Sequence, residues 1–154
     1  MEFHLFGRSS LRFNGNFTLQ EWIEITQILA DVYLEVDFIL MDYPESKASF
    51  VDFTQNNIKV FKNNEDLLNL VALIQILDLL LSVNTANVHI ADNLRIPTLE
   101  IVRQSESRKW ACGAYGGWYD YVVLPPNWQE DRKNYQNLFL QKSKEKISKI
   151  LLSR

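Results

Sequence analysis

The chain has little of the residues that mark special classes of protein. Its 154 residues include one cysteine, Cys112, so an internal disulfide is excluded and a reducing compartment such as the cytoplasm is expected. No apolar stretch approaches the roughly 20 residues that span a bilayer, and the N-terminus has no long apolar signal segment. Five glycines and four prolines form no flexible linker, so we expect a single domain over residues 1–154.

A strong charge of one sign is also missing. The formal net charge is −3, so no global field attracts nucleic acid, and any anion site must be local. Two distant histidines and one cysteine show no metal-ligand spacing, and we expect neither a metal nor a cofactor. The common phosphate motifs GxGxxG and GxxxxGK[ST] do not occur. The whole chain is 47% hydrophobic and 23% charged, which is the composition of a globular protein.

Short apolar runs alternate with segments of helical periodicity. Strands are predicted at 2–6, 36–41, 58–61, 79–83, 98–102 and 121–124. Helices are predicted from Thr18, around 45–53, over 67–77, after Thr85, and over about 129–152. This alternation predicts an α/β fold with parallel β-α-β units and a doubly wound sheet flanked by helices.

Three of these helices carry further predictions. Thr18 and Glu21 form a capping box, with Phe17 and Trp22 placed as a hydrophobic staple. The helix over 67–77 is apolar nearly all round, which predicts burial between neighbours, and its N-cap is expected at Asn63 or Asn64, with Glu65 and Asp66 in its first turn. In the last helix the lysines are expected to form a solvated face, with a peripheral role at a membrane surface as the alternative; they are Lys142, Lys144, Lys146 and Lys149.

The turn at 84–87 is the first candidate site. Ligands of doubly wound sheets bind beyond the carboxyl ends of the strands, so the loops at 7–17, 42–45, 84–87 and 103–118 are the places to examine. Thr85 is a candidate N-cap whose hydroxyl could instead reach a phosphate, and Ala86 is small enough for close approach of a ligand. The alternative is a purely structural helix start.

His89 and the loop after the first strand extend this candidate. His89 lies four residues beyond Thr85 and on the same helix face, where a neutral imidazole could donate a hydrogen bond. Two hydroxyls and two guanidinium groups suit a diphosphate, and a solvated basic loop is the alternative. These four side chains are Arg8, Ser9, Ser10 and Arg12.

The segment 104–120 is rich in aromatic residues and glycine. It could stack on a base or sugar, or cover an apolar surface left by a missing partner, and the sequence does not separate the two. Cys112 lies in this segment without a nearby His or Asn, so a catalytic thiol is not expected.

Residues 65–101 resemble the lipopolysaccharide heptosyltransferases and related bacterial glycosyltransferases of the two-lobed GT-B architecture. The family motif is an apolar strand, then Asp-Thr-(Gly/Ala)-x-x-His-x-Ala, a helix and a Pro-initiated strand. This chain has Asn84-Thr85-Ala86-Asn87-Val88-His89-Ile90-Ala91, with Pro97 ahead of the next strand. Gly7, Ser9, Ser10, Arg12 and Phe13 occupy a place like that of the family's small-residue and basic-aromatic loop.

The resemblance implies a Rossmann-like lobe that binds a nucleotide-diphosphate sugar donor. Its donor-binding residues would be Ser9, Ser10, Arg12, Asn84, Thr85, Ala86 and His89, with no metal required. The acceptor would be a carbohydrate or a lipid-linked glycan, in bacterial lipopolysaccharide or surface glycan synthesis, and the location would be cytoplasmic or peripheral at the inner membrane.

The chain departs from the family in two ways. Asn84 stands where the family has an acidic residue, and the whole chain resembles only the donor-binding C-terminal lobe. The acceptor-binding lobe, which supplies the family's catalytic base, has no counterpart here, so the catalytic residues are unknown. The chain is then an excised or truncated glycosyltransferase donor lobe, a donor lobe completed by another chain, or a non-catalytic, degenerate lobe that acts as an interaction or partner-subunit protein. A further alternative is another single-domain α/β nucleotide-binding module, which the missing phosphate motifs do not support.

Overall fold

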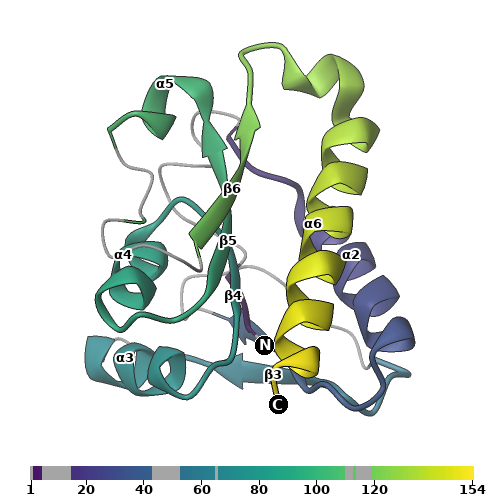
Figure 1. Cartoon of the computed structure of the whole chain (residues 1–154), viewed down its shortest axis with the longest axis vertical. Helices are drawn as coiled ribbons and strands as arrows, with labels where there is room; N and C mark the ends of the chain where they lie inside the picture. The colour runs from purple at the N-terminus through teal and green to yellow at the C-terminus, as the bar shows by residue number, and fades with distance from the viewer. Residues whose placement is uncertain (1, 5–14, 43–52, 65, 110–112, 114–118) are drawn as a thin grey trace.

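The computed structural model describes residues 2–4, 15–42, 53–64, 66–109, 113 and 119–154 of the chain. In this described part of the chain, six parallel strands form one sheet in the order β3-β2-β1-β4-β5-β6 (Figure 1). The strands are β1 (Glu2–His4), β2 (Phe38–Asp42), β3 (Ile58–Lys62), β4 (Leu80–Val83), β5 (Thr98–Arg103) and β6 (Tyr119–Leu124). The predicted α/β, Rossmann-like doubly wound sheet is confirmed.

Helices cover both faces of the sheet. They are α2 (Leu19–Val32), α3 (Leu67–Gln75), α4 (Ala86–Asn93), α5 (Gln104–Ser107) and α6 (Arg132–Leu152), with a short 3₁₀ turn η1 (Trp128–Asp131) before α6. α2 and α6 lie on one face, and α3 and α4 on the other (Figure 1). The strand order reverses between β1 and β4, which creates the crevice where such sheets bind ligands.

An aromatic cluster fills the core between the sheet and the face made by α2 and α6. The rings of Phe17, Trp22 and Phe139 lie 5.2–5.9 Å apart, and Trp128 adds an edge contact to Phe17. All four side chains are buried. Such tilted and edge-to-face pairs stabilise beyond the area they bury, because the ring edges are positive and the faces negative.

The predicted start of α2 is confirmed. Glu21 N–H donates to the Thr18 hydroxyl, and the Glu21 carboxylate accepts from Thr18 N–H, which completes the capping box. Glu21 also accepts two hydrogen bonds from Arg132, whose guanidinium lies 4.4 Å from the centre of the Trp128 ring. Burial alone would raise the pKa of Glu21, but the hydrogen bonds from Arg132 and Thr18 leave that pKa lowered.

The predictions for α3 were wrong in two respects. The N-cap is Asp66, whose carboxylate accepts from Leu68 N–H, whereas Asn63 and Asn64 precede the helix. Asn64 acts one step earlier, accepting from Asp66 N–H. The helix is not buried all round either, because only its inner face packs on the sheet; Leu67, Leu68 and, just beyond the helix, Ile76 are exposed.

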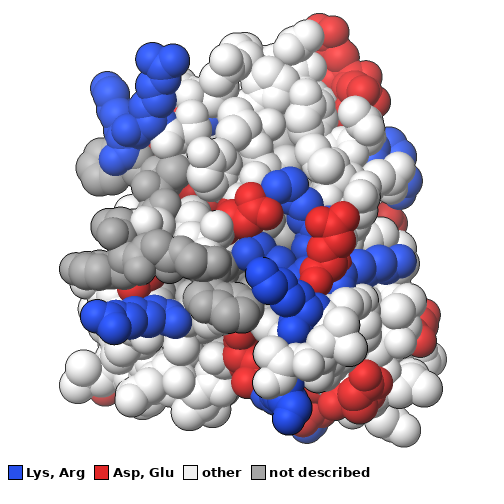
Figure 2. Space-filling model, in the orientation of Figure 1, with Lys and Arg blue, Asp and Glu red and all other residues white. Residues whose placement is uncertain are grey.

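The last helix begins with the 3₁₀ turn η1 and then continues as α6 to Leu152, close to the predicted span. Its lysines are not uniformly solvated: Lys142 pairs with Asp120 of β6 at 2.9 Å, and burial lowers the pKa of Lys146. Basic and acidic side chains are interspersed over this face (Figure 2). Within the described residues, no helix combines the length and apolarity needed to cross a membrane.

Candidate functional site

The carboxyl edge of the sheet is the place where the sequence predicts a ligand. The loops after β1 and β2 begin there, but Arg8, Ser9, Ser10 and Arg12 lie outside the described residues, as do Cys112 and all but the last residue of the helix predicted at 45–53. The described part of this edge consists of the ends of β2 and β3, the turn from β4 into α4, and the segments after β5 and β6.

The turn from β4 into α4 has the shape predicted for it. Asn84 N–H donates to Ile101 O at 2.9 Å, which extends the β4–β5 ladder by one residue. Thr85 follows in an extended conformation at the N-cap position of α4, and Ala86, the first helical residue, is exposed. The strand–turn–helix grammar of the sequence is therefore confirmed.

Thr85 occupies the N-cap position without acting as a cap. Its side chain makes no capping hydrogen bond, and its Oγ1 is buried with no hydrogen-bond partner among the described residues. A buried hydroxyl without a partner loses the free energy of its hydrogen bonds to water, so such atoms in native proteins call for an explanation. A ligand at the N-terminus of α4, where backbone N–H groups and the helix dipole favour anions, would supply that partner.

His89 lies on α4 four residues beyond Thr85, as the sequence predicts. Its side chain is half-buried, and its carbonyl accepts a hydrogen bond from Asn93 Nδ2. The i, i+4 spacing places Thr85 and His89 on the same side of the helix start.

Asn84 has a partner that sequence reasoning missed. Its Nδ2 donates to Oε2 of Glu100, a β5 residue that is 0% exposed, across 3.1 Å. Residues 84 and 100 are brought together by the β4–β5 register, in which Ser82 pairs with Glu100. A polar residue inside an otherwise apolar strand, Thr-Leu-Glu-Ile-Val, was the signal in the sequence that could have found Glu100.

Glu100 is electrostatically unusual. Burial raises the pKa of its carboxyl to about 7, while the nearby Tyr119 side chain and the hydrogen bond from Asn84 oppose the rise, and the charges of Asp92 and Glu106 add to it. An aspartate at position 84 would put a second carboxylate within hydrogen-bond distance of this one. Asparagine instead offers a donor, which explains physically why an amide is accommodated at this position.

Two further buried oxygens lie at the carboxyl edge. Asp42 Oδ1, at the end of β2, and Asn63 Oδ1, directly after β3, are buried without a hydrogen-bond partner among the described residues. The two segments are joined by a hydrogen bond from Asn63 N–H to Asp42 O. Both free oxygens are acceptors, so they are suited to a ligand that carries hydroxyl or N–H donors. The sequence pattern indicated the loop at 42–45 as a candidate site and Asn63 as a helix cap, so the pairing of Asp42 with Asn63 was not predicted.

The segments after β5 and β6 form the remaining part of the edge. Arg103 donates two hydrogen bonds to Glu106, and its side chain lies against Gly15, where an added Cβ would come within 2.7 Å of Arg103 Cδ. Gly15, on the segment between β1 and α2, therefore lies close to Arg103 at the end of β5. An open hollow of about 590 Å³ adjoins it, lined by Arg103, Gln104, Ser105, Leu124, Pro125, Pro126, Trp128 and Gln129.

The chemistry of this edge is that of polar recognition. Within the described ranges, no group of three or more His, Cys, Asp or Glu side chains is placed to hold a metal ion. Comparison with known proteins yields no matching family model, no matching curated protein and no matching solved structure. The geometry of the chain itself is therefore the basis for a functional assignment.

Proposed function

We propose that this chain is a donor-binding lobe for a nucleotide-diphosphate sugar, of the heptosyltransferase-like GT-B kind. The observation that carries the proposal is the pattern of buried oxygens at the carboxyl edge for which the described ranges offer no hydrogen-bond partner. Asp42 and Asn63 present acceptors, which suit the hydroxyl groups of a ribose or sugar, and Thr85 presents a hydroxyl at a helix N-terminus, which suits a phosphate.

The spacing of these groups suits an elongated ligand. They follow β3, β2 and β4, which span four adjacent positions of the sheet with β1 between β2 and β4. At about 4.8 Å per strand, the ends of β3 and β4 are roughly 14 Å apart. A ligand with hydroxyl groups at one end and a diphosphate at the other could reach both, across the point where the strand order reverses.

The proposed reaction is transfer of the sugar from the diphosphate to a carbohydrate or lipid-linked hydroxyl. The bond between the sugar and the diphosphate oxygen breaks as the bond to the acceptor oxygen forms. Negative charge then grows on the leaving diphosphate, which the N-terminus of α4, Thr85, His89 and the Arg12 side chain would stabilise. A separate acceptor-binding lobe would bind the acceptor and supply the base that takes its proton.

Isothermal titration with diphosphate sugars of uridine, adenosine, guanosine and cytidine tests the donor site. We expect one class to bind, and Thr85→Val to weaken its binding by about tenfold, the order expected for one hydrogen bond to a charged group. Thr54→Val is the matched control, because Thr54 is exposed and precedes β3 at the opposite edge of the sheet. Absence of binding, or equal effects of the two variants, would contradict the proposal.

A second candidate function is that of a self-associating interaction protein. The amino-terminal edge of the sheet carries a hollow of about 280 Å³ with a mixed polar and apolar lining, formed by Glu35, Val36, Asp37, Ile39, Ile76, Leu77, Asp78, Leu79, Ile147, Ile150, Leu151 and Arg154. Around it, Leu34, Ile76 and Leu152 are 74–90% exposed. The patch thus combines protruding apolar side chains, a hollow that could receive them and both signs of charge, which suits a two-fold symmetric, self-complementary interface.

Sedimentation equilibrium tests the second candidate. A dimer that Ile76→Ser weakens, and Leu68→Ser does not, would support it, since the two side chains are 74% and 72% exposed but only Ile76 lines the hollow. A monomer at every concentration would overturn it and leave the donor-lobe proposal unaffected.

A further inference from the structure

Glu100 connects the centre of the sheet to the first turn of α4. Its carboxyl group is completely buried, and Oε2 accepts the hydrogen bond from Asn84 Nδ2 at 3.1 Å. Asn84 is the residue immediately before Thr85, the N-cap of α4. A change of charge on Glu100 therefore acts directly on Asn84, the residue next to Thr85 in the proposed phosphate-binding turn.

The groups around Glu100 come from α4, α5, β6 and the turn between β4 and α4. Asp92 of α4 and Glu106 of α5 raise its pKa as negative charges, whereas the hydrogen bond from Asn84 and the Tyr119 side chain of β6 lower it. Glu106 is itself paired with Arg103 at the end of β5. Together with burial, these surroundings raise the pKa of Glu100 to about 7, so its charge changes in the neutral pH range.

We propose that Glu100 is a positioning residue that couples anion binding at the first turn of α4 to the uptake of a proton. This inference rests on the proposed donor site. When Glu100 is ionised, a buried negative charge lies beside the turn and opposes a bound diphosphate, because little solvent screens the interaction. When Glu100 is protonated, that repulsion is absent, and Oε2 can still accept from Asn84.

The coupling is reciprocal. A bound diphosphate favours the protonated form of Glu100 by the same factor by which protonation favours the diphosphate. Binding is therefore accompanied by proton uptake at a pH where the free protein has Glu100 partly ionised. His89 lies on the same helix, so the effect of Glu100 must be separated from that of His89 by substitution.

Titration calorimetry with uridine and adenosine diphosphate glucose measures the coupling, because their esterified phosphates have no ionisation near neutral pH. Between about pH 6 and about pH 8 we expect affinity to fall by about tenfold, a typical coupling between sites. Buffers of different ionisation enthalpy should show proton uptake. Glu100→Gln should abolish both effects, and His89→Gln should retain them.

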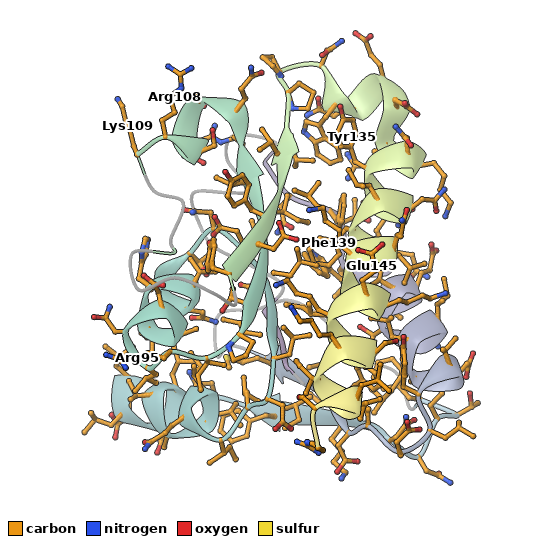
Figure 3. All side chains as sticks on the ribbon, in the orientation of Figure 1. Arg95, Arg108, Lys109, Tyr135, Phe139 and Glu145 are labelled. Carbon is orange, nitrogen blue, oxygen red and sulfur yellow. The ribbon has the colours of Figure 1, made fainter. Side chains whose placement is uncertain are left out.

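Glu145→Gln is the matched control for charge, since Glu145 is exposed on α6, across the sheet from α4 (Figure 3). Affinity that is independent of pH in the unsubstituted protein would overturn the inference and leave the donor site standing. Failure of both compounds to bind at either pH would count against the donor site instead.

Nuclear magnetic resonance of the free protein tests the positioning step without a ligand. The side-chain amide of Asn84 and the backbone amide of Thr85 should shift with the titration of the Glu100 carboxyl, and these shifts should vanish in Glu100→Gln. Amide resonances that stay constant while Glu100 titrates would overturn the inference.

Discussion

At the scale of single residues, the hydrogen bond from Asn84 to Glu100 explains the amide in the β4–α4 turn. No reading of the sequence could predict this pair, because it depends on the register between β4 and β5 and on which face of the sheet residue 100 occupies. The sequence did place Thr85 at the N-cap position. It could not show that the hydroxyl is buried without a partner, since burial depends on elements distant in the chain.

Glu100 should make the protein less stable as the pH rises. Because its folded pKa is about 7 and the ordinary value is 4.5, the native state binds more protons than the unfolded chain between these values. Stability therefore falls as pH rises through this window, by about 3 kcal/mol at 1.36 kcal/mol per pKa unit. Glu100→Gln should flatten the profile and unfold at higher urea than the unsubstituted protein at about pH 8.

Urea denaturation across this pH range, with Glu145→Gln as control, measures the effect. The control should follow the unsubstituted protein, because Glu145 is exposed. Parallel profiles for all three proteins would show that Glu100 titrates as an ordinary carboxyl group.

Arg95 should be a site of relievable backbone strain. It ends α4 with a φ of 58°, the left-handed conformation, in a Schellman motif closed by Ile96 N–H to Ala91 O and Arg95 N–H to Asp92 O. Glycine adopts this conformation without steric cost. Arg95→Gly is expected to raise the free energy of unfolding by up to about 1 kcal/mol, whereas Arg95→Ala, which keeps the Cβ that causes the strain, is not expected to raise it. A loss of stability in Arg95→Gly would show that the contacts of the arginine side chain contribute more free energy than its left-handed backbone conformation costs.

At the scale of elements, local signals predicted well wherever a segment has one strong pattern. The capping box fixed the start of α2, and short apolar runs located the described strands to within about two residues, as boundary uncertainty allows. The prediction that α3 is buried all round was wrong, because an all-apolar pattern does not show which side of a helix faces the sheet. The prediction of its N-cap was wrong because Asn63, Asn64 and Asp66 are all good capping residues, and only the path of the backbone determines that Asp66 is the cap.

Packing of α6 on the sheet should depend on Phe139. This side chain is 0% exposed and contacts the rings of both Phe17 and Trp22 (Figure 3 shows it pointing from α6 toward the sheet). Phe139→Ala is expected to lower the free energy of unfolding by about 3–5 kcal/mol through lost burial and the cavity left behind. Leu138→Ala, at a neighbouring position that is 38% exposed, should cost far less. Thermal unfolding monitored by circular dichroism measures both, and similar losses would contradict this description of the core.

At the scale of the whole molecule, the two edges of one sheet differ in chemistry. The carboxyl edge carries buried polar oxygens that have no hydrogen-bond partner in the described part of the chain, at Asp42, Asn63 and Thr85, whereas the amino edge carries exposed apolar side chains around a hollow. The strand order β3-β2-β1-β4-β5-β6 puts its reversal in the middle of the polar edge. The alternation of strands and helices predicted a doubly wound sheet, but the order of its strands required the structure, because crossover lengths alone allow several orders.

The most direct test of this account is a nuclear magnetic resonance titration of the isotope-labelled chain with uridine and adenosine diphosphate sugars. A ligand bound across the reversal point should shift the backbone amides of Asp42, Asn63, Thr85 and Ala86 together, because these residues lie at the ends of β2, β3 and β4. Amides at the amino edge, such as those of Ile76 and Leu152, should stay unchanged. Shifts confined to the amino edge, or none at saturating ligand, would contradict the assignment of the carboxyl edge as a nucleotide-sugar site.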